Sequence, residues 1–192
     1  GEIARAAAEY LGEPAPPPDD AGALVRRALD AVAAEGPVDD TTVLPLCEDA
    51  LAVATAFVRQ HDLVTIYDDA VEIVEMPEIH RGVAVAYCDA PGPLEPRALP
   101  TFFAVAPTPT GWDDARVASF YREYNASMLH NLTVHEAMPG HVLQLAHSRR
   151  CSTPSRVRTT FMSGTFVEGW AVYAEQLMAE RGYDAGRGER GA

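Results

Sequence analysis

Lysine is absent from this chain, and cysteine is scarce. All 15 basic residues are arginine, against 28 acidic residues, which gives a formal net charge of −13. Such a surplus repels nucleic acids and anionic membrane surfaces, so neither is an expected partner. No apolar run reaches the roughly 18 residues of a membrane-spanning helix, and no signal peptide is recognisable. The sequence therefore predicts no membrane segment.

The three cysteines, Cys47, Cys88 and Cys151, are odd in number and widely separated. They form no Cys-x-x-Cys pair, and they indicate neither a zinc knuckle nor a disulfide framework. Unpaired cysteines are typical of a reducing compartment, so we predict a cytoplasmic location. The hydrophobic fraction of 47% and the charged fraction of 22% are those of a globular protein.

Local patterns predict an α+β fold, mainly α-helical with a small β-sheet, in one partial catalytic domain over residues 1–192. Helices are expected at 2–11, 20–35, 41–60, 112–124, 127–137, 139–150 and 161–181. Strands are expected at 63–66, 71–75, 83–87 and 101–106, in an antiparallel or mixed sheet whose first two strands form a hairpin. The chain then divides into N-terminal helices (1–60), the sheet (61–110), metal-binding helices (111–182) and a disordered tail (183–192) rich in glycine and charge.

Residues 135–141 read His-Glu-Ala-Met-Pro-Gly-His and hold two of the six histidines. Zinc sites that activate water combine neutral imidazole ligands with a carboxylate that is free to take a proton. In the usual His-Glu-x-x-His motif, one helix face presents both imidazoles. Here six residues rotate the side chain by about 240° net, so an unbroken helix would point His135 and His141 apart. We therefore predict that Pro139 and Gly140 break the helix and turn His141 back toward His135.

Glu168 is a third candidate ligand, near the start of the helix expected at 161–181 and on or beside its apolar stripe. A buried carboxylate without a partner costs several kcal/mol, so a cation is expected nearby. Gly169 fits a place where another helix or a ligand comes close. The alternative is that Glu168 and the two histidines are ordinary residues at helix ends, where the dipole favours them. Taken together, His135, His141 and Glu168 predict a metal site with an open fourth position.

Two further residues of the same helix are candidates for supporting roles. Glu175 lies seven residues after Glu168 on the same face and could orient a ligand imidazole, although an exposed or arginine-paired glutamate explains it equally well. Tyr173 could donate a hydrogen bond to an oxyanion. Packing is the simpler explanation for Tyr173, because it lies about 140° from Glu168 around the helix.

The segments 135–141 (HEAMPGH) and 168–175 (EGWAVYAE) resemble the bacterial family known as domain of unknown function 885, which is grouped with the zincin-like zinc peptidases. The second segment is also similar to the Glu-Gly-Phe-Ala-x-Tyr-x-Glu segment of gluzincin aminopeptidases, whose glutamate binds zinc. The resemblance implies His135, His141 and Glu168 as ligands of one Zn²⁺ and Glu136 as general base. It also implies a partial zincin-like fold, because the family's chains are longer and continue with a Pro-Gly-Gln-Ala segment expected to line the site.

The function that the resemblance implies is a zinc-dependent peptidase that cleaves the amide bond of a peptide or small amide substrate through a metal-activated water. Two alternatives stay open: a metal-dependent hydrolase of a non-peptide ester or amide, and a truncated fragment that binds metal without activity. In peptidases of this superfamily an edge strand near the metal pairs with the substrate backbone. The strand expected at 102–106 could take this role, although core packing alone explains Phe102 and Phe103.

Overall fold

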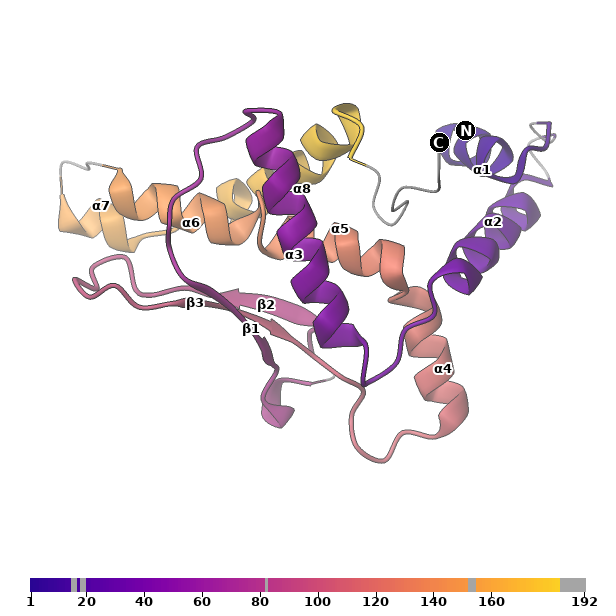
Figure 1. Ribbon diagram of the computed structural model, residues 1–192, viewed down its shortest axis with the longest axis horizontal. Coiled ribbons are helices and arrows are strands. Elements are labelled where there is room, and N and C mark those ends of the chain that lie inside the picture. The colour runs from indigo at the N-terminus through magenta and orange to yellow at the C-terminus, as the bar shows by residue number, and fades with distance from the viewer. Residues whose placement is uncertain (15–16, 18–19, 82, 152–154, 184–192) are drawn as a thin grey trace.

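The computed structural model describes residues 1–14, 17, 20–81, 83–151 and 155–183. It is mainly helical with a three-stranded sheet, so the predicted α+β class is confirmed (Figure 1). None of the helices in these ranges is long and apolar enough to cross a membrane.

The elements in chain order are α1 (Glu2–Leu11), α2 (Ala21–Glu35), α3 (Val43–Gln60), β1 (Val71–Glu75), the 3₁₀ turn η2 (Glu78–His80), β2 (Ala86–Asp89), β3 (Thr101–Val105), α4 (Asp114–Glu123), α5 (Ala126–Glu136), α6 (His141–Arg150), α7 (Arg156–Thr160) and α8 (Gly164–Glu180).

The sheet is mixed, with the strand order β1-β3-β2. The central strand, β3, pairs in parallel with β1 and antiparallel with β2. The strand predicted at 63–66 does not form, and the predicted hairpin is therefore wrong. Leu63, Val64 and Ile66 instead pack against a buried cluster of the helices, which explains their apolar character without a strand. The strand predicted at 83–87 forms three residues later, at Ala86–Asp89.

The larger core lies between the sheet and the helices α3 and α5, and α3 crosses over the sheet in Figure 1. Phe103 and Val105 of β3 are fully buried there, together with Cys47 of α3 and Leu129 of α5. Burying a large apolar side chain contributes about 1.5–3 kcal/mol, so these contacts hold α5 firmly on the sheet. Because α5 ends at Glu136, this core fixes the backbone on which the site is built.

A second cluster joins the helices that carry the candidate ligands. Val134 of α5, Leu143 of α6 and Met178 of α8 are buried together against Val58 of α3. Val134 directly precedes His135 and Leu143 follows His141 by two residues, so this packing positions both histidines. The short helix α7 was not predicted, and the helix expected at 161–181 begins three residues later, as α8. Of the predicted tail only residue 183 is described; residues 184–192 lie outside the described ranges.

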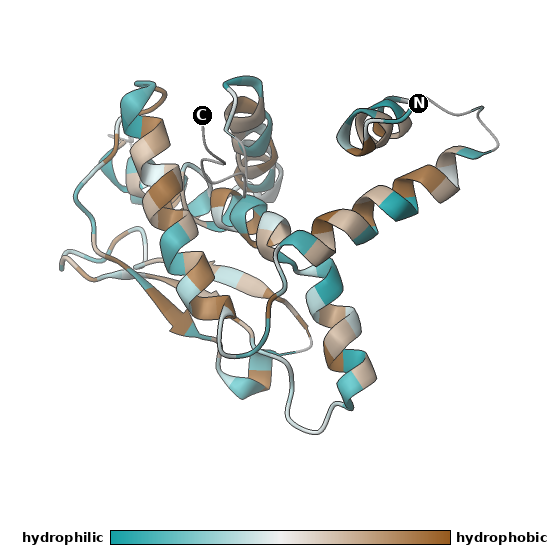
Figure 2. Cartoon of the chain, turned by 45° about the vertical axis from the view of Figure 1, so that its right-hand side comes forward, coloured by the Kyte–Doolittle hydropathy of each residue, from teal (hydrophilic) through white to brown (hydrophobic). Residues whose placement is uncertain are grey.

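The helices α1 and α2 form a hairpin that projects from the body of the molecule (Figure 2). They pack on each other through a small cluster of their own, made of Ala7, Ala8, Leu24 and Ala28. An ion pair between Asp30 of α2 and Arg122 of α4 connects the hairpin to the body. The predicted N-terminal helices are therefore present.

Candidate metal centre

The break predicted near Ala137 is present in the structure. Helix α5 ends at Glu136 and α6 begins at His141, two residues later than expected. In the turn between them, the N–H of Gly140 donates to the carbonyl oxygen of Val134 at 3.0 Å. As a result, the imidazole rings of His135 and His141 lie 4.9 Å apart between centroids, with their planes at 88°.

Glycine is required at position 140 because there is no space for a side chain. A Cβ atom at this position would lie 1.7 Å from the carbonyl oxygen of His135 and 2.4 Å from that of Val134. Its φ of −71° is not left-handed, while its ψ of −132° lies outside the helical and extended regions. The turn is also fastened to α8, because the indole N–H of Trp170 donates to the carbonyl oxygen of Pro139 at 2.9 Å.

The three predicted ligands come together. The Oε2 atom of Glu168 lies 3.6 Å from Nε2 of His135 and 3.7 Å from Nε2 of His141. The three ligand atoms are all within 4.8 Å of one another, and no other cluster of this kind occurs among the described residues. Adjacent ligand atoms around a tetrahedral zinc ion are about 3.4 Å apart, so small side-chain adjustments would make this a fitting set.

The burial argument for Glu168 is wrong. Its side chain is 67% exposed, whereas those of His135 and His141 are 21% and 10% exposed. No other described helix comes close at Gly169, because a Cβ built there meets no described atom within 4 Å, and the approach of a ligand stays a prediction. Both residues lie on the exposed first turns of α8. Glu168 is thus a candidate ligand because of its position opposite the two imidazoles, and not because of its burial.

Glu175 holds the imidazole of His135 in place. Its Oε1 atom lies 2.6 Å from Nδ1 of His135, and its Oε2 atom accepts a hydrogen bond from the side-chain amide of Asn131 at 2.7 Å. A carboxylate only accepts, so Nδ1 carries the proton and the lone pair of Nε2 faces Glu168. Asn131 was missed from the sequence, although it precedes His135 by four residues on α5 and so shares its helix face.

The surroundings of His141 favour its neutral form. Burial lowers the pKa of His141 and the neighbouring His135 lowers it further, while the charge of Glu168 acts in the opposite direction. Its Nδ1 atom is buried without a hydrogen-bond partner in the described part of the chain. The two imidazoles and the carboxylate of Glu168 therefore converge on one small space, an arrangement that suits a bound cation.

Glu136 lies between the imidazoles and the sheet. Burial raises the pKa of its carboxyl group, and the charge of Glu168 raises it further, while His135 and a hydrogen bond from the backbone N–H of Cys88 act in the opposite direction. Cys88 belongs to β2, an edge strand. The role considered for the strand at 102–106 is wrong, because β3 is the central strand and Phe103 is fully buried. The edge next to Glu136 is that of β2.

Tyr173 is 50% exposed, and its ring lies 5.9 Å from that of Trp170 between centroids. This ring contact is consistent with the packing role favoured from the sequence, on a half-exposed side chain. The role of Tyr173 as a hydrogen-bond donor to an oxyanion stays a prediction.

Comparison with known proteins relates this chain to bacterial sequences. A family model described as "Bacterial protein of unknown function (DUF885)" matches residues 1–190. A solved structure of "a putative lipoprotein of unknown function" from Shewanella oneidensis is similar at 32% identity and a TM-score of 0.77, covering 95% of this chain and 32% of that one. A "putative lipoprotein" from Colwellia psychrerythraea shares the fold, at 21% identity and a TM-score of 0.60, covering 94% of this chain and 29% of that one. This chain thus spans about a third of the length of these proteins. No curated protein matches it.

Proposed function

This chain belongs to the DUF885 family of bacterial proteins, and we propose that it is a zinc-dependent hydrolase of the zincin-like type that cleaves peptide bonds. The observation that carries the proposal is the convergence of His135, His141 and Glu168, with their ligand atoms within 4.8 Å of one another. Two imidazoles and one carboxylate are the donor set of catalytic zinc sites that keep the fourth position open for water or substrate. The hydrogen bond from His135 to Glu175 supports the assignment, because ligand histidines usually donate their second N–H to such a partner.

A zinc ion held by these three side chains would lower the pKa of a water molecule to about 7 and polarise a scissile carbonyl. The chain's own contribution to the proton transfers is Glu136. It follows His135 directly, so it points about 100° away around the helix and does not compete for the same coordination direction. The raised pKa of Glu136 lies closer to neutral pH than that of an ordinary glutamate. A carboxylate with such a pKa can take a proton from the attacking water and pass it to the leaving amine.

The position of β2 supports a peptide substrate over a small ester. Only one side of β2 is paired with a strand in the described part of the chain, and the backbone N–H of Cys88 on its other side reaches Glu136. An extended peptide can add to such an edge through its own backbone hydrogen bonds. Pairing with β2 would bring the peptide's carbonyl groups alongside the general base.

The direct test compares the zinc-loaded chain with the chain treated with a chelator, on a panel of peptides and of carboxylic esters. We expect about one zinc ion per chain, peptide hydrolysis in its presence, loss of that hydrolysis after chelation and recovery when zinc is returned. Hydrolysis of esters alone would favour the non-peptide alternative. Zinc binding without turnover on any substrate would favour the inactive fragment. The same panel on a full-length relative shows what the remaining two thirds of those chains add.

Replacing Glu175 with glutamine should weaken zinc binding about 10- to 100-fold, because the proton on Nδ1 of His135 loses its charged acceptor. The measurement is zinc affinity by competition with a chromogenic chelator. Glu180→Gln is the matched control on the same helix, since Glu180 bonds to Gln176 at 2.7 Å. Equal zinc affinity in the two variants would show that Glu175 does not orient the ligand.

A further inference from the structure

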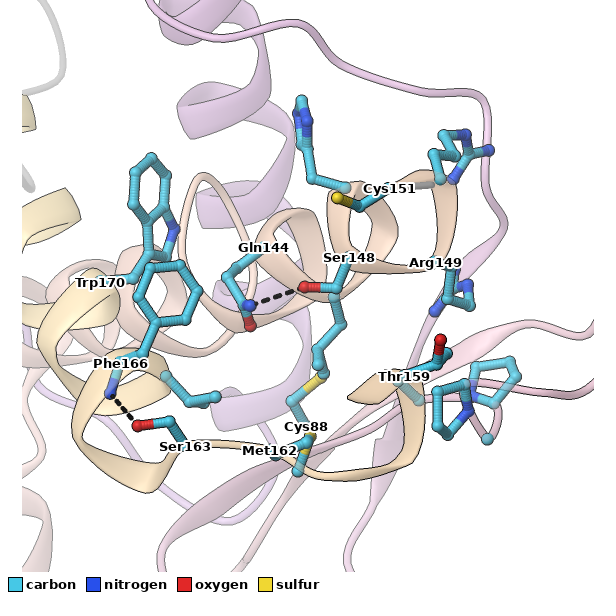
Figure 3. Close-up of a pocket in the computed structure, with 18 of the residues that line it drawn as sticks. Cys88, Gln144, Ser148, Arg149, Cys151, Thr159, Met162, Ser163, Phe166 and Trp170 are labelled. Atoms are coloured by element: carbon cyan, nitrogen blue, oxygen red, sulfur yellow. Dashed lines mark hydrogen bonds between the residues drawn. The ribbon is translucent and has the colours of Figure 1, made fainter. Parts of the chain in front are cut away.

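A cavity of about 1040 Å³ lies beside the candidate metal centre, lined by α6, the end of α7, the first turns of α8 and the loop after β2 (Figure 3). This volume is at the upper end of small-molecule pockets and is sufficient for several residues of a peptide. Much of its wall is apolar, contributed by Val64, Leu145, Phe161, Met162, Phe166 and Trp170.

The cavity adjoins the metal centre through residues that neighbour the candidate ligands, while His135, Glu136, His141 and Glu168 themselves do not line it. On α6, Gln144 and Ser148 follow His141 by three and seven residues, so the three share one helix face, and both Gln144 and Ser148 line the cavity. Trp170, two residues after Glu168, also lines it, as does Cys88, whose backbone N–H bonds to Glu136. A peptide bound at the metal centre would therefore extend toward the cavity.

Three arginines, Arg149, Arg150 and Arg158, line the cavity. Figure 3 shows Trp170 at one end and Arg149 at the other. Asp69 pairs with two of the three, at 3.4 Å from Arg149 and 2.7 Å from Arg150. Nη1 of Arg149 is buried and has no hydrogen-bond partner among the described residues. The third, Arg158, is exposed, and the ion pairs found in the described ranges do not include it.

The charge along the cavity is opposite to that of the chain. Its lining includes three arginines and one carboxylate, that of Asp89, and Asp69 pairs with Arg149 and Arg150, so the arginines exceed the carboxylates by one. The whole chain carries −13. Arginine pairs with carboxylates through two parallel hydrogen bonds, and apolar walls strengthen such a pair by excluding water.

We propose that this cavity binds the acidic segment of a peptide substrate, with a glutamate or aspartate side chain paired to Arg149 and Arg158. The inference rests on the proposed peptidase function for the position of the peptide. An α-helix rises about 1.5 Å per residue, so the eight steps from His141 to Arg149 span about 12 Å. An extended peptide rises about 3.3 Å per residue. The acidic residue therefore lies three or four residues from the scissile bond.

The test uses two fluorescent peptides that are identical except at one position near one end, which is glutamate in one peptide and glutamine in the other. Both are blocked at their termini, so that side chain is the only carboxylate. Binding is measured by anisotropy with the chelator-treated chain, which separates this inference from catalysis. We expect the glutamate peptide to bind about three- to tenfold more tightly, with a preference that falls as salt is added. In the zinc-loaded chain, cleavage should occur three or four residues from the glutamate.

Arg158→Gln and Arg149→Gln should each reduce the preference for the glutamate peptide to below about twofold. Arg156→Gln is the matched control, because Arg156 lies on α7 but does not line the cavity. Arg158 is exposed, so its replacement leaves the fold intact. Equal binding of the two peptides, or an equal preference in Arg158→Gln and Arg156→Gln, would overturn the inference even if the chain hydrolyses peptides. If the chain prefers the glutamate peptide, and this preference depends on the arginines, but the chain hydrolyses no peptide, the binding site would be supported and the proposed peptidase function contradicted.

Discussion

Glu136→Gln is expected to keep the zinc content of the chain and to lower the rate of peptide hydrolysis by about 10²-fold or more. Glutamine preserves the size of the side chain and the acceptor for the backbone N–H of Cys88, so the local structure should survive. It cannot accept the proton of the attacking water. Because Glu136 is not in the ligand cluster, the three metal-binding side chains are unaffected.

His141→Ala and Glu168→Gln are the matched variants, and both should lose zinc. The informative measurement is zinc content by mass spectrometry or atomic absorption, alongside the hydrolysis rate, on the same preparations of all three variants. If Glu136→Gln loses zinc as readily as His141→Ala, then Glu136 is a ligand and the assigned roles are wrong. If it retains both zinc and full turnover, another group accepts the proton.

Gly140→Ala should destabilise the chain by about 3 kcal/mol and lower its zinc affinity by at least about tenfold. The added Cβ would meet the carbonyl oxygen of His135 at 1.7 Å and that of Val134 at 2.4 Å. Both are backbone atoms of α5, so no side-chain rotation can relieve the overlap. The turn itself must move, and His141 moves with it, because α6 begins at the next residue.

Gly169→Ala provides the control for this prediction. It makes the same chemical change inside α8, where a Cβ would meet no described atom within 4 Å. Alanine is favoured over glycine in a helix by about 1 kcal/mol, so this variant should be as stable as the parent or more so. Urea unfolding and zinc titration of the two variants decide the matter. Similar stability of both would show that the turn has room that the structure does not indicate.

The local structure of this chain could be read from the sequence because its causes are local. An alanine-rich composition predicted the helix at 2–11 and apolar residues at helical spacing predicted the one at 20–35, and the structure has α1 and α2 close to these bounds. The break after Glu136 followed from the spacing of His135 and His141 together with the neighbouring Pro139 and Gly140. A histidine pair six residues apart can share a metal only if the helix is interrupted between them.

Where a segment's partner is distant, the sequence was misleading. Leu63, Val64 and Ile66 have the alternating apolar character of a strand, but they pack on the helices without joining the sheet. The residues at 101–105 were predicted as a strand correctly, yet their place at the centre of the sheet depends on pairing with both β1 and β2. That pairing leaves β2, and not β3, at the edge beside Glu136.

For the candidate site, the sequence by itself determined which side chains were available: two histidines around a break and a glutamate some thirty residues later. Only the tertiary structure decided that Glu168 is exposed, that Glu175 bonds to His135, and that arginines of α6 and α7 line one cavity. The difference has a physical basis. Helix periodicity and breaks arise from backbone geometry over a few residues. The contacts of the site depend instead on how α8 packs across α5 and α6. This packing is set by the burial of Val134, Leu143 and Met178, which are far apart in the chain.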